Sequence, residues 1–322
     1  MRAITRQLPA LVAVAAIAAA SAACGSSTAG NSTAGTTSAQ ADSAGFPVTV
    51  TTAGGKTHLT ARPDAIVSLS PTATEMLYAI GAGKQVEAVD SDSDYPRTAP
   101  ITKLSGFEPN AEAIAAYKPD LVIISNNIDG ITAKLTALSI PVLDLPAAAD
   151  LSDVYSEFTE LGAATGHVTQ AKSEDSKLAA EVASVLASEP KHTKPLTYYY
   201  ELSANPYYSV TDSTFVGSVL SLLGMKSIAD AATGAAAAGG YPELSPEFIL
   251  KANPDYILLA DTGSANGGQD AATVGSRPGW SVLTAVKEKH IIVLNADIAS
   301  RWGPRIIDLL KTVAAGIKSG SP

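Results

Sequence analysis

The feature that most constrains the fold of this sequence is a motif that occurs twice. Its copies are EAIAAYKPDLVII, residues 112–124, and EFILKANPDYILL, residues 247–259. Each has a glutamate, an isoleucine two residues later, a Pro-Asp pair at the seventh and eighth positions after the glutamate, and an apolar run. Proline ends a helix and the apolar run after it is typical of a buried strand. Two helix–turn–strand units that start 247 − 112 = 135 residues apart therefore predict two lobes of similar design.

Both glutamates of the motif come just after a residue type that commonly caps helices. Asn110 precedes the first predicted helix, and Ser245, followed by Pro246, precedes the second. A carboxylate in the first turn stabilises the positive end of a helix dipole by ~0.3–1 kcal/mol. This structural explanation accounts for Glu112 and Glu247 one at a time, but not for their matched placement on two lobes.

The chain before residue 150 alternates predicted strands and helices. Residues 48–60 alternate in polarity around a glycine turn and predict a small hairpin. Pro71 opens a helix that Gly81 and Gly83 end. Strands are expected at residues 65–70, 86–89, 121–125 and 141–145, and further helices at 111–117 and 130–138. Strands this uniformly apolar are covered on both faces, which predicts a parallel sheet.

A long helical segment is expected next. One helix ends at Gly166, and residues 169–189 then place apolar side chains on one stripe without a helix breaker before Pro190. Twenty-one residues at ~1.5 Å each give ~31 Å, enough to span a small domain. After it, strands are expected at 196–202 and 291–295 and helices at 215–224, 280–286 and 303–317, around the second copy of the motif.

The predicted fold is therefore an α/β protein with two Rossmann-like lobes, each a mostly parallel sheet flanked by helices, joined by a single long helix. The predicted boundaries are a signal peptide at 1–23, a flexible tether at 24–45, an N-terminal lobe at 46–150, a connecting helical segment at 151–190 and a C-terminal lobe at 191–322.

The N-terminus is typical of an exported protein. Arg2 and Arg6 precede an apolar stretch, residues 8–20, that is too short to span a bilayer as a mature helix. Cys24 is the single cysteine, so it cannot form an internal disulfide, and its position after SAA predicts the lipid-bearing first residue of a mature lipoprotein. Ser21 stands where Leu or Val is usual for lipidation, and cleavage by an ordinary signal peptidase is the alternative.

Composition narrows the partners that can be expected. Residues 25–45 are mostly Ser, Thr, Gly and Ala, which cannot bury enough apolar surface to offset the cost of ordering, so a flexible leash to a membrane is predicted. The net charge of −9, without a basic cluster, argues against nucleic acid.

Motifs for catalysis or metal binding are weak. GGKT at residues 54–57 resembles the end of a phosphate loop, but Val50 stands where that motif needs glycine. The sequence has no G-x-S-x-G, and no two of its four histidines lie within five residues of each other. Asp90, Asp92 and Asp94 alternate with serines, without a base, a nucleophile and an oxyanion donor grouped nearby. Neither an enzyme nor a directly bound metal or cofactor is expected.

Several segments together resemble the class III solute-binding lipoproteins of ABC importers, a family that carries vitamin B12, ferric siderophores and haem. They are SLSPTATEMLYAIGAGKQVEAVDSDSDYP from residue 68, both Pro-Asp motifs, RPGWSVLTAVKEKHIIVLN from residue 277 and SRWGPRIIDLL from residue 300. The resemblance covers essentially everything from Phe46 onward. It implies a two-lobe fold with a helical backbone, a ligand cleft between the lobes and little hinge motion. Together with the N-terminal sequence, we expect a monomer that is lipid-anchored to the outer face of the cytoplasmic membrane.

The resemblance also implies roles for particular residues. In corrinoid-binding members a glutamate at the tip of each lobe docks into arginine pockets of the permease dimer, and Glu112 and Glu247 occupy those positions here. By motif position, the ligand cleft is expected to include Ser70, Pro71, Thr72, Asp92, Tyr95, Phe107, Asn126 and Asn127 from the first lobe, and Glu201, Asn205, Tyr207, Tyr208, Tyr241, Arg301 and Trp302 from the second. Tyr198 to Tyr200 and Trp280 are better explained as buried core.

The sequence departs from the corrinoid pattern in the first lobe. Asp92 stands where the B12 carrier has an aromatic residue, and Gly106 and Ser125 lie near positions where tryptophans flank its cleft. Arg301 could pair with carboxylate or hydroxamate oxygens of a ferric siderophore. A siderophore and a corrinoid are therefore equal candidates; the alternatives are a haem carrier on this fold, or a sensor or enzyme on this fold that does not transport.

Overall fold

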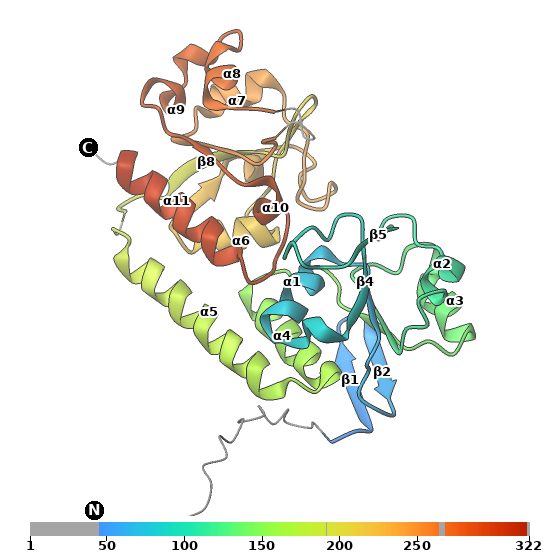
Figure 1. Cartoon of the computed structure of the whole chain (residues 1–322). Helices are drawn as coiled ribbons and strands as arrows, with labels where there is room; N and C mark the ends of the chain where they lie inside the picture. The colour runs from blue at the N-terminus through green and yellow to red at the C-terminus, as the bar shows by residue number, and fades with distance from the viewer. Residues whose placement is uncertain (1–44, 191, 264–267, 321–322) are drawn as a thin grey trace, which may run out of the picture. The chain divides into compact units, whose positions relative to one another are not determined.

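The computed structural model describes residues 45–190, 192–263 and 268–320 (Figure 1). The predicted signal peptide, Cys24 and all of the predicted tether except Gly45 lie outside the described residues.

The first lobe is built on a five-stranded parallel sheet. Its strand order is β5-β4-β3-β6-β7, and every neighbouring pair is parallel. The strands are β3 (Ile66–Ser68), β4 (Val86–Asp90), β5 (Ile101–Leu104), β6 (Leu121–Ile124) and β7 (Val142–Asp144). The predicted hairpin precedes them as the antiparallel pair β1 (Val48–Thr52) and β2 (Gly55–Leu59). The parallel sheet predicted from apolar strands is confirmed.

Helices cover both faces of this sheet. They are α1 (Pro71–Ala79), α2 (Ala111–Ala115) and α3 (Ile131–Ala137), with short 3-10 turns η1 (Ala82–Gln85) and η2 (Ile128–Gly130). Ile114 of α2 and Leu135 of α3 share one buried cluster with Val67 and Val122 of the sheet. Met76 and Leu77 of α1 belong to a second cluster with Ile66 and Ile123, because alternate strand residues point to opposite faces.

Two consecutive helices join the lobes. They are α4 (Leu151–Thr165), capped by Asp150 and ended by Gly166 in the left-handed conformation, and α5 (Val168–Ser188). The buried side chains of α5 include Leu178 and Val182, as the predicted stripe requires. In Figure 1, α5 runs beside the C-terminal helix α11 (Ile306–Gly320), and Lys311 of α11 donates to Glu181 of α5 at 2.7 Å.

The second lobe repeats the design with four parallel strands in the order β11-β8-β12-β13. They are β8 (Leu196–Glu201), β11 (Met225–Ser227), β12 (Tyr256–Leu259) and β13 (Ile291–Val293), with a small hairpin of β9 (Ser203–Ala204) and β10 (Tyr207–Tyr208). Its helices are α6 (Phe215–Ser221), α7 (Pro246–Ala252), α8 (Ala271–Ser276), α9 (Thr284–Lys287) and α10 (Ala296–Ala299), with 3-10 turns η3 (Ile228–Ala231) and η5 (Trp280–Val282).

One hydrophobic cluster continues from the first lobe into the second. Its members include Phe158 and Leu161 of α4, Leu178 of α5, and Leu310 and Val313 of α11. Tyr198 and Tyr200 belong to the same cluster, whereas Tyr199 and Trp280 lie in a separate cluster on the other face of the second sheet. All four aromatic side chains are almost fully buried, so their prediction as core is confirmed.

The aspartate of the repeated motif makes similar hydrogen bonds in both lobes. The Asp120 carboxylate accepts from the backbone N–H groups of Asp64 and Ala65, each at 3.0 Å, just before β3. The Asp255 carboxylate accepts from the backbone N–H of Thr197 at 2.8 Å and from its hydroxyl at 2.7 Å, at the start of β8. The aspartate therefore fixes the strand of each motif to its central neighbour.

The residue before each Pro-Asp pair also has the same unusual backbone. Lys118 has φ of 50° and Asn253 has φ of 47°, both in the left-handed region. A left-handed residue followed by proline reverses the chain between helix and strand within two residues. The similarity of the motif copies thus extends to backbone conformation.

Some predicted elements differ from the structure. The helix expected at residues 280–286 is divided into η5 and α9, because Leu283 is extended, with φ of −62° and ψ of 138°. The helix expected from residue 303 begins at Ile306. The short elements β5, β11, α8 and α10 were not predicted, since three to six residues give too little periodicity to recognise.

Within the described residues no helix combines the length and the apolar character needed to cross a membrane.

Replacing the motif aspartates should destabilise the two lobes unequally. Asp255→Ala removes the acceptor of two part-buried bonds and should cost ~2–3 kcal/mol of unfolding free energy, whereas Asp120→Ala, whose bonds are exposed, should cost ~1 kcal/mol. Urea unfolding of both variants measures the difference. Equal losses would show that burial does not set the strength of these bonds.

Candidate functional site

A cavity of about 560 Å³ lies where the strand ends of the first lobe meet the segment between α10 and α11. Its first-lobe wall follows the carboxyl ends of β3 to β7, where α/β folds commonly bind ligands. The lining residues are Leu69, Ser70, Pro71, Thr72, Asp90, Asp92, Gly106, Phe107, Ser125, Asn126, Ala147, Asp297, Ser300, Arg301 and Trp302.

The cavity brings together about half of the ligand-binding residues predicted from the sequence. Those that line it are Ser70, Pro71, Thr72, Asp92, Phe107, Asn126, Arg301 and Trp302. The other predicted residues do not line the cavity; they are Tyr95, Asn127, Glu201, Asn205, Tyr207, Tyr208 and Tyr241. Direct contact between any of these side chains and a ligand stays a prediction.

The first lining residues also form the start of α1. Ser70 is the N-cap, and its hydroxyl accepts from the backbone N–H of Ala73 at 3.2 Å. Pro71 takes the first helical position, where its missing N–H costs nothing. Ser70 and Thr72 are almost fully buried, so they shape the cavity floor more than they offer exposed polar groups.

A buried ionic cluster joins the two lobes beside the cavity. Glu75 of α1 is 2% exposed, and its carboxylate accepts from Arg301 at 3.1 Å and from Arg305 Nε at 2.8 Å and Nη2 at 2.5 Å. Both arginines come from the segment before α11 in the second lobe. We call these three side chains the interlobe cluster. One carboxylate from one lobe is thus held between two guanidinium groups from the other.

Two predicted ligand residues belong to the surroundings of this cluster. Arg301 also donates to the Asp94 carboxylate at 3.0 Å and to the backbone carbonyl of Asp92 at 2.8 Å. The Arg305 guanidinium lies 4.1 Å from the centre of the Tyr95 ring, a cation–π contact. The structure therefore gives Arg301 and Tyr95 contacts within the protein that the sequence did not predict.

A buried carboxyl group lies at the first-lobe end of the cavity. Asp90 is 1% exposed and accepts from the hydroxyl of Ser93. Burial raises its pKa to about 6, and the hydrogen bonds from Ser93 and from the backbone of Gly106 oppose this shift only in part. A Cβ atom at Gly106 would lie 2.5 Å from the carbonyl oxygen of Leu69, which explains why no large side chain can stand there.

Trp302 is held by an acidic partner from the connecting helices. Its indole N–H donates to both carboxylate oxygens of Glu157 in α4, at 3.1 Å each. Glu157 is 5% exposed, and burial raises its pKa to about 8, with the Trp302 hydrogen bond acting in the opposite direction. Glu157 therefore fixes the orientation of the one tryptophan in the cavity lining.

Glu201 is placed inside the second lobe rather than at the cavity. Its carboxylate is fully buried and accepts from Arg277 Nη1 at 2.5 Å and from Nη2 at 2.7 Å. The guanidinium stacks over Trp280 and Tyr207, at 4.6 and 5.3 Å from the ring centres. This bidentate pair accounts for Glu201 and Tyr207 as parts of the lobe's packing.

The other predicted residues outside the cavity lining are on the surface. Asn205 is exposed at the β9–β10 turn, and the side chain of Asn127 accepts from the backbone N–H of Thr132 at 3.0 Å. Tyr208 and Tyr241 are 40% and 48% exposed, on backbone segments bridged at Tyr208 and Glu243. Aromatic side chains are enriched at protein–protein interfaces.

The two motif glutamates are exposed at the starts of their helices. Asn110 and Ser245 cap α2 and α7 as predicted, accepting from the backbone N–H groups of Ala113 and Phe248. Glu112 and Glu247 both point to solvent rather than into a core. The helices that carry them, α2 and α7, belong to different lobes (Figure 1), so each lobe has one exposed motif glutamate.

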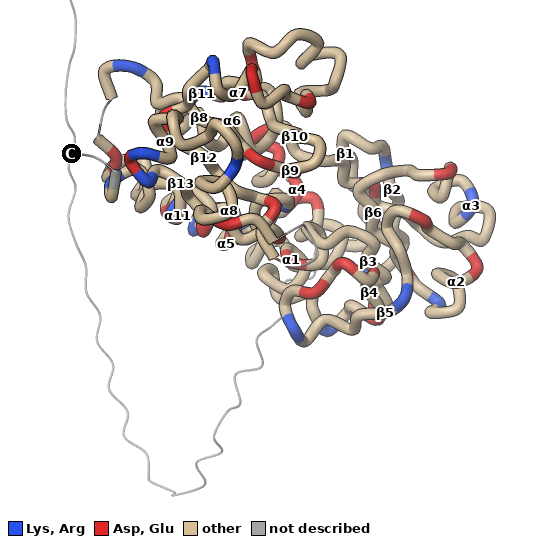
Figure 2. The backbone as a smooth tube through the Cα atoms, turned by 90° about the horizontal axis from the view of Figure 1, so that it is seen from above, with Lys and Arg blue, Asp and Glu red and all other residues tan. Residues whose placement is uncertain are grey.

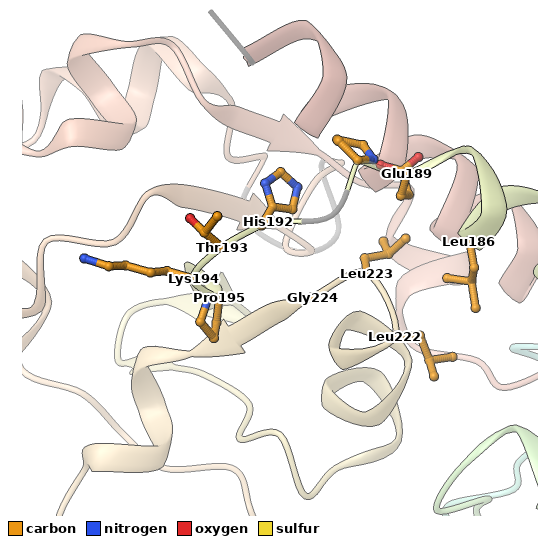
Figure 3. Close-up of a pocket in the computed structure, with 10 residues that line it drawn as sticks. Leu186, Glu189, His192, Thr193, Lys194, Pro195, Leu222, Leu223 and Gly224 are labelled. Atoms are coloured by element: carbon orange, nitrogen blue, oxygen red, sulfur yellow. The ribbon is translucent and has the colours of Figure 1, made fainter.

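A second cavity of about 400 Å³ lies where α5 leads into β8 (Figure 3). Leu186 and Glu189 line one side of it, and Lys194, Pro195 and Leu223 line others. None of the predicted ligand residues reaches this place. Because the cavity between the lobes contains eight of them, it is the better candidate for a binding site.

The distribution of charged residues and of possible metal ligands limits the kinds of ligand that the protein can bind. Figure 2 shows Lys and Arg on both lobes, interspersed with Asp and Glu. Among the described residues no three His, Cys, Asp or Glu side chains converge to hold a metal ion.

Sequence reasoning missed the residues that organise the cavity. Glu75 is the single charged residue of the helix PTATEMLYA, which is a signal for a buried ion pair. Arg305 stands four residues after Arg301 in a segment that is not helical, so helical spacing gives no signal that both arginines meet Glu75. Glu157 and Asp297 have no signal in the sequence that distinguishes them from solvated carboxylates.

Comparison with known proteins places the chain among binding proteins of one family. A family model described as periplasmic binding protein matches residues 66–298. An ABC transporter substrate-binding lipoprotein of Bacillus subtilis, itself uncharacterized, is 29% identical over 286 residues, 84% of this chain and 86% of that protein. A vitamin B12-binding protein of Vibrio cholerae is 30% identical over 267 residues, 79% of this chain and 88% of the relative.

Solved structures agree with this fold. The periplasmic vitamin B12-binding protein of Vibrio cholerae gives a TM-score of 0.64 at 27% identity, covering 80% of this chain and 98% of that chain. A possible iron-binding solute-binding protein of Staphylococcus epidermidis gives 0.66 at 26% identity, covering 80% and 99%. A heme-binding protein of Vibrio cholerae gives 0.69 at 18% identity, covering 79% and 98%, which shows the fold alone. The predicted fold class is confirmed.

Removing the carboxylate of the interlobe cluster should be costly. Glu75→Gln removes the buried carboxylate that both arginines share, leaves Arg305 without its ion-pair partner, and should lower the free energy of unfolding by ~3–5 kcal/mol. Lys311→Met is the matched control, because it breaks the exposed pair with Glu181 and should cost much less than Glu75→Gln. Urea unfolding compares them; equal losses would contradict a structural role for the cluster.

Glu157 should make stability depend on pH. Its pKa is about 8 in the folded protein, compared with an ordinary 4.5. Protonated Glu157 therefore contributes fully to the free energy of unfolding below pH 4.5, and this contribution is lost as pH rises through 8. Glu157→Gln keeps an acceptor for Trp302. As pH rises from 5 to 8, the free energy of unfolding of this variant should therefore increase relative to that of the wild type, by at most ~1.4 kcal/mol for each pH unit. Unfolding curves at pH 5, 7 and 9 test this, and parallel pH profiles would refute it.

Proposed function

This chain belongs to the periplasmic binding protein family, and we propose that it is the substrate-binding protein of an ABC importer that carries a ferric siderophore or a corrinoid. The observation that carries the proposal is the cavity between the lobes, at the carboxyl ends of the parallel strands. Its walls offer the aromatic side chains of Phe107 and Trp302 and several polar groups, which suits a large ligand that needs stacking and polar anchors.

The relatives support this class of cargo. One curated relative is named a vitamin B12-binding protein and another an ABC transporter substrate-binding lipoprotein. The protein binds and releases its ligand unchanged, as the family description, periplasmic binding protein, supports. Phe107, Asn126, Asp92 and Trp302 contact the ligand, and Tyr208 and Tyr241 extend the contact surface on the second lobe.

A permease dimer is the partner that receives the ligand. Glu112 and Glu247 are exposed at equivalent positions of two similar lobes, so they can meet two related permease subunits in the same way. Carboxylates that pair with arginines across such a contact set orientation and encounter rate more than affinity. Phe248 of α7 also lines an apolar hollow of about 580 Å³ with Ile228 and Ala231, which adds contact surface beside Glu247.

The N-terminal sequence supports attachment to a membrane. Cleavage before Cys24 and lipidation of its thiol leave about twenty small, polar residues between the lipid and the first strand. The protein then stays at the outer face of the cytoplasmic membrane, close to its permease, as a monomer attached by a flexible tether. A curated relative is likewise named a lipoprotein.

Ligand binding can be measured directly by calorimetric titration of the chain from Gly45 onward. Cyanocobalamin or a ferric hydroxamate siderophore should bind with a dissociation constant below ~1 μM, about −8 kcal/mol. Phe107→Ala should weaken that binding, because this ring is 71% exposed at the cavity and is available for stacking. Absence of heat with both classes of chelate at tens of micromolar would refute the proposed function.

Charge reversal of the docking glutamates should separate transport from binding. Glu112→Arg and Glu247→Arg should each abolish uptake of the ligand by cells and leave its affinity within about twofold, since neither residue lines the cavity. Glu87→Arg and Asp308→Arg reverse exposed carboxylates elsewhere and should leave uptake intact. A loss of ligand affinity in the docking variants would place these residues in the binding site instead.

A further inference from the structure

The charged groups that line the cavity are mostly negative. Among the lining residues of the described chain, Asp90, Asp92 and Asp297 carry carboxyl groups and Arg301 carries the single guanidinium. Asp92 is exposed and Asp297 has a side chain that is 47% exposed, so both carboxylates can reach a ligand. A ligand in this cavity therefore meets more acidic than basic groups.

The one guanidinium is already engaged by the protein. Arg301 donates to Glu75 at 3.1 Å, to Asp94 at 3.0 Å and to the carbonyl of Asp92 at 2.8 Å. A fourth acceptor, Asp297, lies 3.6 Å from Nη2. An anionic ligand would have to compete with these groups for a guanidinium that has five N–H donors in total.

The neighbouring groups do not restore a positive potential. Arg305, the other cation of the interlobe cluster, is bound twice to Glu75 and stacks on Tyr95. The two positive charges of Arg301 and Arg305 face Glu75, Asp94 and the three lining aspartates, Asp297 being 3.6 Å from Arg301, so carboxyl groups outnumber guanidinium groups by five to two. Ser125 and Asn126 add neutral polar groups only.

We propose that this cavity selects a neutral or cationic metal complex that presents N–H donors, and discriminates against complexes with free carboxylates. The inference rests on the proposed function and narrows its ligand class. Amide and ammonium groups can donate to the aspartate oxygens, whereas a ligand carboxylate would be repelled by them and would find no unengaged cation. The aromatic rings of Phe107 and Trp302 accept either kind of ligand and supply no charge preference.

This selection separates the candidate cargoes by chemistry. A corrin ring edged with carboxamides and a hydroxamate chelate with a terminal amine both fit an acidic cavity. A porphyrin with two propionates, or an iron complex of citrate, carries the excluded charge. The same cavity therefore argues against haem as the cargo without reference to the size of the ligand.

Matched ligands test the charge preference by itself. Three ferric trihydroxamate chelates with the same iron shell can be used, with the terminal amine free, acetylated or succinylated, so that their charges are +1, 0 and −1. Cyanocobalamin and its derivative with one ring carboxamide hydrolysed to a carboxylate form a second pair. Calorimetric titration at low salt should give an affinity lower by about five- to tenfold for each added negative charge.

Variants identify the groups responsible. Asp92→Asn and Asp297→Asn should each reduce the difference between the neutral and the anionic member of each set, and the double variant should reduce it to less than about twofold. Both residues are on the surface, and Asp92→Asn keeps the backbone carbonyl that Arg301 uses. Asp308→Asn, on α11 and outside the cavity lining, is the control and should leave the full difference.

The outcomes separate this inference from the proposed function. If the anionic members bind as tightly as the neutral ones, or more tightly, the charge preference is wrong and the binding function stands. If the preference is present but unchanged in the double variant, its assignment to Asp92 and Asp297 is wrong. If no member of either set binds, the proposed function fails and the charge inference fails with it.

Discussion

One carboxylate, held between two guanidinium groups, fixes the point at which the two lobes of this protein contact each other. Glu75 belongs to the first helix of the first lobe, and Arg301 and Arg305 come from the segment that leads into the last helix of the second. Burying the Glu75 carboxylate without these partners would be strongly unfavourable, so the cluster favours contact between the lobes at this point. The cavity lies beside this polar contact, whereas the apolar contact between the lobes runs through α4, α5 and α11.

The rest of the fold reinforces this contact. A single hydrophobic cluster runs from the first lobe through α4 and α5 to α11, and the 21-residue helix α5 ties the lobes together along its length. Opening the lobes would expose part of that cluster and separate Glu75 from its partners. These features fit the little hinge motion that the family resemblance implies, and they favour a binding protein whose cavity is largely formed before the ligand arrives.

Much of this architecture could be predicted from the sequence because the signals are local and repeated. The Pro-Asp motif specified helix, turn and strand twice, and the apolar strands indicated parallel sheets, both of which the structure confirms. Contacts between distant residues could not be predicted in this way. Glu157 and Trp302 are 145 residues apart, and Glu75 and Arg305 are 230 apart, so no periodicity connects them. Arg301 was expected to face a ligand for the same reason, since its pairing with Glu75 is visible only in three dimensions.

Some residues of the site can be substituted at little cost in stability, and others cannot. The segment from Asp297 to Arg305 lines the cavity and forms the contact between lobes, so a change that admits a new ligand there would also alter that contact. On the opposite wall, Asp92, Phe107 and Asn126 are exposed and stand at strand ends that the sheet itself holds in place. Ligand preference in this fold can therefore change through the first-lobe wall at little cost in stability, whereas the second-lobe wall is constrained by the interlobe cluster.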